Sequence, residues 1–217
     1  MTYIIGIVSQ KGGVGKSTLA RLLAREVAAG GATVKIADLD IQQGTSFKWA
    51  SRRAANGITP EVRVEMFANV KTAITEAETF DVYILDGAPH ASRDTREVAR
   101  AADLVVIPTG QSLDDLEPSV LLAHDLVRDG IDRRRIAFAL CKVSDSAREV
   151  EGARAYLAEA GYQVLEGEIP FRTGFSIALD QGKAVTETNF RSLSKRADRL
   201  AQAIIDAAAS APERQVA

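Results

Sequence analysis

The chain contains a single cysteine in 217 residues, so no disulfide can form within it and nothing indicates an oxidising compartment. No apolar run approaches the ~18 residues that a membrane-spanning helix needs. The first apolar run, Tyr3–Val8, is not preceded by the basic residues of a secretory signal peptide. We therefore expect a cytoplasmic protein without stable membrane association.

An excess of positive charge is also missing. The chain has 27 basic against 29 acidic residues, for a formal net charge of −2. This balance excludes a globally basic nucleic-acid binder, although it allows a local basic patch. Solenoid-length repeats and low-complexity linkers are absent as well, which predicts one domain over residues 1–209. The tail 210–217 contains Pro212 and few apolar residues, so we expect it to fray.

Short β-rich runs alternate with longer amphipathic stretches along the chain. Strands are predicted at Tyr3–Val8, Thr33–Ala37, Val62–Met66, Val82–Leu85, Leu104–Ile107, Ile136–Cys141 and Val164–Ile169. Helices are predicted at Ser17–Ala29, Ser46–Ala55, Val70–Glu78, Pro118–Val127, Ala147–Ala160 and Ser192–Ala209. This alternation predicts an α/β fold, a doubly wound and mostly parallel sheet with helices on both faces.

The strongest chemical signal is a glycine-rich loop, Gln10–Thr18, between the first strand and the first helix. Glycines let the backbone wrap closely around an anion, and the free amides at a helix start attract phosphate oxygens. Lys16 can place a charge on the β- and γ-phosphates, and the Ser17 hydroxyl suits Mg²⁺. A turn that binds nothing is the alternative, but strand, loop, Lys-Ser pair and helix all occur in the expected order. The predicted nucleotide contacts in this loop are Lys11, Gly12, Gly13, Val14, Gly15, Lys16, Ser17 and Thr18.

Three aspartates follow predicted strands. Asp38 and Asp40 are two residues apart, a spacing that places both side chains on one face of an extended chain. Asp86 ends the apolar strand Val82–Leu85, as a Walker B aspartate does. Carboxylates at strand ends beside a phosphate loop can organise Mg²⁺ and position an attacking water. Capping of the following helix is the alternative for Asp38 and Asp40.

These motifs together resemble those of the ParA/MinD ATPases. Lys11–Ser17 (Lys-Gly-Gly-Val-Gly-Lys-Ser) resembles their deviant Walker A motif, in which Lys11 matches the additional signature lysine. Asp38–Gln42 is similar to their second motif, D-x-D-P-Q, with Ile41 in place of the proline. The resemblance extends over about residues 2–206, and Trp49 favours the small ParA-type proteins.

The resemblance implies roles for individual residues. Lys11 would reach across an ATP-sandwich homodimer to the partner's phosphates, Asp40 would serve hydrolysis, and Asp38 would lie near the metal with Ser17 and Asp86. Adenine contacts would come from the loop Pro170, Phe171 and Arg172, and late segments of the family are matched by Pro108-Thr109 and Gly182–Glu187.

The implied function is that of a Mg²⁺-dependent ATPase associated with the nucleoid. It would bind ATP, dimerise, bind DNA without sequence preference, and be stimulated by a ParB-like centromere-binding or cargo adaptor protein. Arg191, Lys195 and Arg199 form a basic stripe on the last predicted helix that could follow a DNA backbone, or simply face solvent. Arg133–Arg135 is interpreted as a solvated loop. No helix-turn-helix segment precedes the phosphate loop, so binding to a specific operator is not expected.

Two alternative functions remain open. A MinD-like membrane-associated ATPase should end in a basic helix with bulky apolar residues, whereas Ala207–Pro212 is poor in them. A nucleotide-gated DNA-binding module with little turnover is disfavoured by Asp40 and Asp86. Cys141, His90 and His124 lack partners for catalysis or metal binding, so we interpret Cys141 as a buried apolar residue and His90 as a solvated loop residue.

Overall fold

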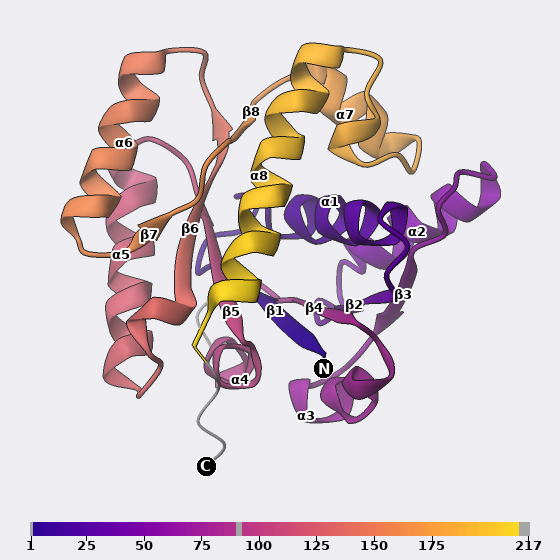
Figure 1. Cartoon of the computed structure of the whole chain (residues 1–217), viewed down its shortest axis with the longest axis horizontal. Coiled ribbons are helices and arrows are strands. Elements are labelled where there is room, and N and C mark those ends of the chain that lie inside the picture. The colour runs from indigo at the N-terminus through magenta and orange to yellow at the C-terminus, as the bar shows by residue number, and fades with distance from the viewer. Residues whose placement is uncertain (1, 90–92, 213–217) are drawn as a thin grey trace.

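A computed structural model describes residues 2–89 and 93–212, and shows one eight-stranded sheet between two layers of helices (Figure 1). Seven strands follow the order β3-β2-β4-β1-β5-β6-β7, β8 pairs with β6, and every pairing is parallel. The predicted fold class is confirmed. Within the described residues, no helix is both long and apolar enough to span a bilayer.

The elements have the following bounds. The strands are β1 (Tyr3–Ile7), β2 (Val34–Asp38), β3 (Arg63–Met66), β4 (Val82–Asp86), β5 (Leu104–Thr109), β6 (Ile136–Val143), β7 (Gln163–Val164) and β8 (Ile169–Pro170). The α-helices are α1 (Lys16–Ala29), α2 (Thr45–Ala55), α3 (Val70–Ala73), α4 (Arg93–Ala101), α5 (Leu113–Arg128), α6 (Ala147–Glu159), α7 (Thr173–Asp180) and α8 (Arg191–Ser210). Short 3₁₀ helices are η1 (Ile74–Thr79), η2 (Arg133–Arg135) and η3 (Val185–Glu187).

The two faces of the sheet carry separate cores, because successive side chains of a strand point to opposite faces. Ile5 and Ile7 of β1 pack with α1 and α8, whereas Ile4 of β1 and Val8, which directly follows it, belong to the core formed with α4, α5 and α6. The continuous apolar run at the start of the chain is thus buried on both sides, as expected of a central parallel strand. Because all strands are parallel, their carboxyl ends lie together at one edge of the sheet, between the two helix layers.

The prediction of one helix over Val70–Glu78 is corrected by the structure. Only the four residues of α3 are α-helical, and η1 follows as a tighter 3₁₀ segment. The Thr75 hydroxyl donates to the Thr72 carbonyl at 2.7 Å, and the Thr79 hydroxyl donates to the Glu76 carbonyl at 2.7 Å. Short hydroxyl side chains that bond to nearby carbonyls compete with the α-helical pattern, so the regular helix ends early.

The strand predicted over Val164–Ile169 is also wrong, because it is divided into β7 and β8. Between them Gly167 adopts a φ of 77°, where a Cβ would lie 2.6 Å from the Leu200 nitrogen of α8. Extended strand geometry is thus interrupted at a glycine that approaches the backbone of α8 closely. Two helices, α4 and α7, were not predicted at all.

Helix α5 begins at Leu113, five residues before its predicted start at Pro118. A proline favours the first helical position, but Pro118 lies inside this helix. Because proline has no N–H, the carbonyl of Asp114, four residues earlier, is left without its intrahelical donor. Helix α8 ends at Ser210, close to its predicted end, and residues 213–217 of the predicted tail lie outside the described residues.

Candidate functional site

The carboxyl ends of β1, β2 and β4 bring the phosphate loop and the aspartates together. Asp38 ends β2 and is the register partner of Asp86, which ends β4. Asp86 is in turn the register partner of Ile7, the last residue of β1 before the loop. Adjacent central strands therefore present both carboxylates at the edge from which the loop emerges, where open α/β sheets bind ligands.

The phosphate loop depends on glycine at two positions. Gly13 and Gly15 adopt φ angles of 74° and 114°, in the left-handed region that favours glycine. A Cβ on Gly15 would also lie 3.1 Å from the Cβ of Cys141, so the loop packs directly on β6. Cys141 is 1% exposed, and burial raises its pKa to about 12. It is a packing residue, as its sequence context predicted.

Lys16 is the first residue of α1 and directly follows the glycine-rich loop. Its side chain is buried, and its ammonium donates to the Lys11 carbonyl at 3.1 Å. Burial lowers the pKa of Lys16, while the carboxylates of Asp86 and Asp40 act in the opposite direction. The ammonium is thus held inside the loop, close to two acids, where the phosphates of a nucleotide would meet it.

Asp86 is the acid best suited to a metal. Its Oδ2 accepts from the Ser46 hydroxyl at 2.7 Å, but its Oδ1 is buried without a hydrogen-bond partner in the part of the chain that the structure describes. Burial raises the pKa of Asp86 to about 6, and the hydroxyls of Ser46 and Ser17 oppose this shift. A buried carboxylate oxygen beside a serine hydroxyl fits Mg²⁺, which prefers oxygen ligands and retains waters. In the described residues, no group of three or more His, Cys, Asp or Glu could hold a metal by itself.

Asp38 caps helix α2. Its Oδ2 accepts from the backbone N–H groups of Ser46 and Phe47 at 2.9 and 3.1 Å, and its Oδ1 accepts from the Asp40 N–H at 3.1 Å. Burial raises the pKa of Asp38, and these three hydrogen bonds act against that shift. Of the two interpretations of Asp38, the structure therefore displays helix capping. A metal bound through water remains compatible with it.

Asp40 is half-buried at the start of the turn that leads into α2. Its Oδ1 accepts from the Gln43 N–H at 3.0 Å, and the turn closes with the Gly44 N–H donating to the Asp40 carbonyl at 2.7 Å. Within the described residues, the bond from Gln43 is the one hydrogen bond that the Asp40 carboxylate accepts. Asp40 is therefore positioned by the turn while retaining an oxygen that can accept from a water.

Ser46 is a site residue that the sequence did not indicate. It is fully buried in the first turn of α2, and it connects both aspartates, with its N–H donating to Asp38 and its hydroxyl to Asp86. Arg21 of α1 lies behind it, with Nε 3.4 Å from the Ser46 hydroxyl. The only available signal was a serine near a predicted helix start, which is too common to single out a residue.

We expect Ser46→Ala to lower the free energy of unfolding by about 1–3 kcal/mol, because it removes the hydroxyl that donates to the buried Oδ2 of Asp86. The matched control is Ser51→Ala on the same helix, where an exposed hydroxyl donates only to the Phe47 carbonyl. That variant should change stability by less than about 0.5 kcal/mol. Urea unfolding without nucleotide measures both, and equal effects would contradict a special role for Ser46.

A groove of about 740 Å³ runs from the phosphate loop to the loop after β8. It is lined by Lys11, Gly12, Gly13, Val14, Gly110, Gln111, Ser112, Asp115, Cys141, Lys142, Val143, Ser144, Asp145, Phe171 and Arg172. The pairing of β8 with the end of β6 places Phe171 and Arg172 at its far end. Of the predicted adenine contacts, Phe171 and Arg172 line this groove, whereas Pro170, which is buried in β8, does not.

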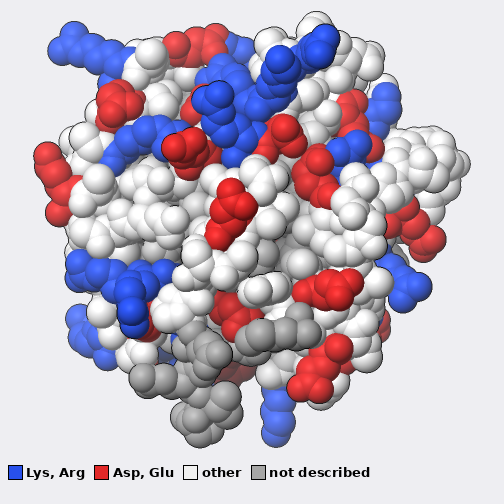
Figure 2. All heavy atoms as spheres, viewed as in Figure 1, with Lys and Arg blue, Asp and Glu red and all other residues white. Residues whose placement is uncertain are grey.

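The predicted basic stripe is exposed on α8. Figure 2 shows Lys and Arg side chains gathered at the top of the face on which α8 lies, with acidic side chains between and below them. Arg191, Lys195 and Arg199 are all exposed. The adjacent Arg196 is instead engaged by Glu168 and Asp145 at 2.9 and 3.3 Å.

The cluster Arg133–Arg135 forms the short η2 helix, in which Arg133 and Arg134 are exposed as predicted but Arg135 is buried, which corrects the prediction for that residue. Arg135 is 6% exposed and donates to the Ala99 and Asp103 carbonyls at 3.2 and 3.3 Å, at the end of α4. Arg133 lies 4.8 Å from the ring centroid of Tyr162. Predicting such contacts requires knowing that α4 ends beside this cluster. His90 lies outside the described residues.

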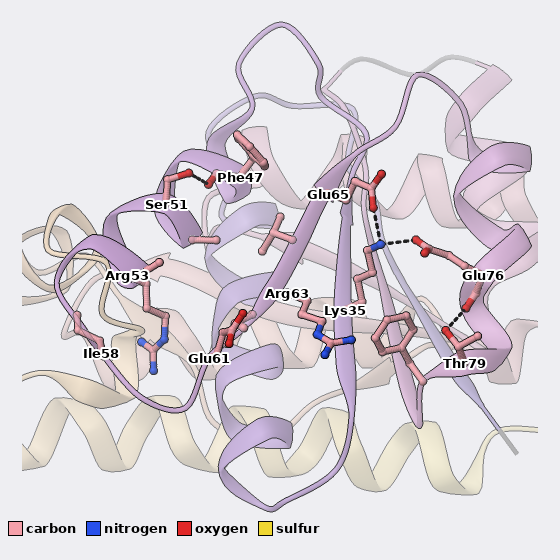
Figure 3. A pocket seen from close by; sticks show the side chains of 15 residues that line it. Lys35, Phe47, Ser51, Arg53, Ile58, Glu61, Arg63, Glu65, Glu76 and Thr79 are labelled. Carbon is pink, nitrogen blue, oxygen red and sulfur yellow. Dashed lines mark hydrogen bonds and ion pairs between the residues drawn. The ribbon is translucent and has the colours of Figure 1, made fainter.

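A second hollow of about 710 Å³ lies at the opposite edge of the sheet, beside β3 (Figure 3). Its central cation, Lys35, points between Glu65 and Glu76 and is paired with both. Arg53, at its other end, is paired with Glu187 at 2.6 Å. Both buried cations of this hollow are thus paired with acids, and its remaining charged side chains include the exposed Glu61 and Arg63.

Comparisons with known proteins show which family and which fold this chain is similar to. The family model of the CobQ/CobB/MinD/ParA nucleotide-binding domain matches residues 5–185. Protein ParA of Rhizobium radiobacter is 29% identical over 216 residues, covering 96% of this chain and 94% of the relative. The chromosome-partitioning ATPase Soj of Thermus thermophilus is also 29% identical, covering 84% and 87%. The structure of MinD from Pyrococcus horikoshii complexed with Mg-ADP has a TM-score of 0.75 at 16% identity, covering 94% and 96%, which shows the fold.

Proposed function

The chain belongs to the CobQ/CobB/MinD/ParA nucleotide-binding domain family, and on that premise we propose that it is a ParA-type Mg²⁺-dependent ATPase. In this proposal residues 1–209 act as one ATPase domain that forms a homodimer with ATP, binds DNA without sequence preference, and positions plasmid or chromosomal DNA or another large cargo. The observation that carries the proposal is the buried Lys16 ammonium held inside the glycine loop, together with the buried Oδ1 of Asp86, which has no hydrogen-bond partner among the described residues.

The loop and its lysine bind the phosphates. The N–H groups at the start of α1 and the Lys16 ammonium would contact the β- and γ-phosphate oxygens. Ser17 and Asp86, with Asp38 behind them, would hold Mg²⁺, which neutralises phosphate charge when bound. Asp40 would accept a hydrogen bond from the attacking water and so orient it toward the γ-phosphate. Catalysis here is mostly positioning and charge neutralisation.

The far end of the groove would receive the base. Phe171 is 67% exposed and offers an aromatic face, while Arg172 is held beside it through its ion pair with Asp145. The Phe171 N–H donates to the Val143 carbonyl at 2.9 Å, which fixes this loop to the end of β6. Backbone groups of this loop can contact adenine without a specific side chain.

The proposed partners are DNA and an adaptor. The exposed stripe Arg191, Lys195 and Arg199 would contact phosphates of duplex DNA, which would associate the ATP dimer with the nucleoid in the cytoplasm. A ParB-like or cargo adaptor protein would stimulate hydrolysis and release the dimer. Measuring phosphate release with and without duplex DNA tests whether the protein hydrolyses ATP. A dimer that binds DNA with ATP but never releases phosphate would favour the nucleotide-gated DNA-binding module.

Replacing Arg191, Lys195 and Arg199 together with alanine should weaken DNA binding and flatten its salt dependence while preserving ATP-driven dimerisation. Each phosphate contact adds roughly −0.9 to the slope of log affinity against log salt concentration. For a dimer that loses all three residues in both protomers, the slope should therefore become less negative by up to about 5. Fluorescence anisotropy with two unrelated duplexes over a salt series, with and without ATP, measures the effect.

The control for this prediction removes the same charge elsewhere. Lys48, Lys71 and Arg148 are exposed on α2, α3 and α6, away from the α8 stripe. Their triple alanine variant should keep the parental slope. If both triple variants lose slope equally, the stripe has no particular role and only the net charge matters.

A further inference from the structure

The signature lysine is not free in this monomer. The Lys11 ammonium lies 2.9 Å from Asp115 Oδ1 and also donates to the carbonyl of Asp114. The contact connects the phosphate loop to the first turn of α5, about a hundred residues further along the chain. The two side chains are 39% and 31% exposed, at the mouth of the nucleotide groove that both of them line.

The acceptor site on α5 depends on three local features. The Ser112 hydroxyl donates to Asp115 Oδ2 at 2.9 Å, which leaves Oδ1 toward the lysine. A Cβ at Gly110 would collide with the Asp115 carboxylate, so this side chain requires glycine there. The Asp114 carbonyl is available because Pro118 cannot donate to it. Two oxygens are thereby presented side by side to one ammonium.

The charge state of the acid favours this contact. Burial alone would raise the pKa of Asp115, but the hydrogen bonds from Lys11 and Ser112 outweigh it, so the pKa lies below its usual value. The carboxylate is therefore ionised at neutral pH and retains its attraction for the ammonium. A lysine held in this way is directed at α5 of its own chain.

We propose that Asp115 is a positioning residue that holds Lys11 within its own protomer, and that dimerisation with ATP requires this ion pair to open. This inference rests on the proposed function, in which Lys11 reaches the partner's phosphates. The same ammonium cannot serve both acceptors at once. Asp115 therefore opposes the dimer until nucleotide phosphates on the partner compete successfully for Lys11.

The test replaces Asp115 with asparagine, which keeps an acceptor for Ser112 but removes the charge. Its matched control is Asp114→Asn, which loses the same charge in the same helical turn, while the Asp114 side chain makes no hydrogen bond or ion pair among the described residues. Partly exposed ion pairs shift an equilibrium by about 1.4-fold to fivefold. Because a dimer opens two of them, Asp115→Asn should lower the dimer dissociation constant by about twofold to 25-fold relative to Asp114→Asn.

Two measurements separate this inference from the proposed function. Sedimentation velocity over an ATP titration reports the dimer. Amine labelling of the nucleotide-free monomer, followed by mass spectrometry, reports Lys11 directly, and its rate should rise in Asp115→Asn while Lys48 remains unchanged. Unchanged Lys11 labelling, or a dimer no tighter than that of Asp114→Asn, overturns the inference. A weaker dimer in Asp115→Asn also overturns it, since Asp115 would then support the dimer. Failure of the parental protein to dimerise with ATP contradicts the proposed function itself.

Discussion

Lys16→Ala should abolish ATP binding at micromolar concentrations. The ammonium is buried and donates to the Lys11 carbonyl of the phosphate loop, so it is held at the predicted phosphate site. Loss of a charged hydrogen bond and its Coulomb attraction costs about 3 kcal/mol or more, which corresponds to a rise in Kd of about 100-fold. Isothermal titration calorimetry with ATP and Mg²⁺ measures this change.

The control for Lys16→Ala is Lys48→Ala, which removes an exposed lysine of α2 whose ammonium donates to the Gln43 carbonyl at 2.7 Å. ATP affinity should be unaffected by that change. Because Lys16 is buried, circular dichroism should first establish that the alanine variant is folded. Parental ATP affinity in a folded Lys16→Ala protein would show that nucleotide does not bind at this loop.

Asp40→Ala should stop turnover without preventing ATP binding or dimerisation. Its carboxylate retains an oxygen free for water while the turn fixes the other through Gln43, so its removal affects the chemical step. Loss of a group that orients or deprotonates the nucleophile lowers kcat by about 10²–10⁴-fold. With hydrolysis stopped, the ATP dimer should accumulate and remain on DNA, as gel filtration and anisotropy would show.

Asp40→Asn distinguishes this role from a structural one. The asparagine can still accept from the Gln43 N–H at the first position of the turn, so the path into α2 should be kept. Turnover should fall as far as in Asp40→Ala. Phosphate release at the parental rate in either variant would exclude Asp40 as the water-positioning group, and a defect confined to the alanine variant would assign Asp40 to the turn.

The late segment Gly182–Glu187, which resembles a family motif, has a structural explanation. Arg53 of α2 donates to the Gly182 carbonyl at 3.1 Å and pairs with Glu187, and the Trp49 indole donates to the Lys183 carbonyl at 3.0 Å. A Cβ at Gly182 would collide with the backbone of Arg53. The segment therefore holds α2, the helix whose first turn contacts both Asp38 and Asp86.

The sequence alone was sufficient for the features that depend on neighbouring residues. Apolar runs of strand length, alternating with amphipathic stretches, predicted the parallel sheet, because a buried parallel strand must be apolar on both faces. Glycines followed by Lys16 and Ser17 predicted the phosphate loop, because the loop's conformation and its contacts come from one short segment. The strand that ends at Asp86 was predicted for the same reason.

Tertiary structure decided the features that join distant segments. The local periodicity of the sequence indicates which face of a helix or strand is apolar, but it does not indicate which other element packs against that face. The sequence therefore could not show that Ser46 bridges two aspartates, that Arg135 is buried at the end of α4, or that β8 pairs with β6 and carries Phe171 to the groove. Nor could it show that Lys11 is held by Asp115, because that contact needs the packing that brings the start of α5 beside the phosphate loop.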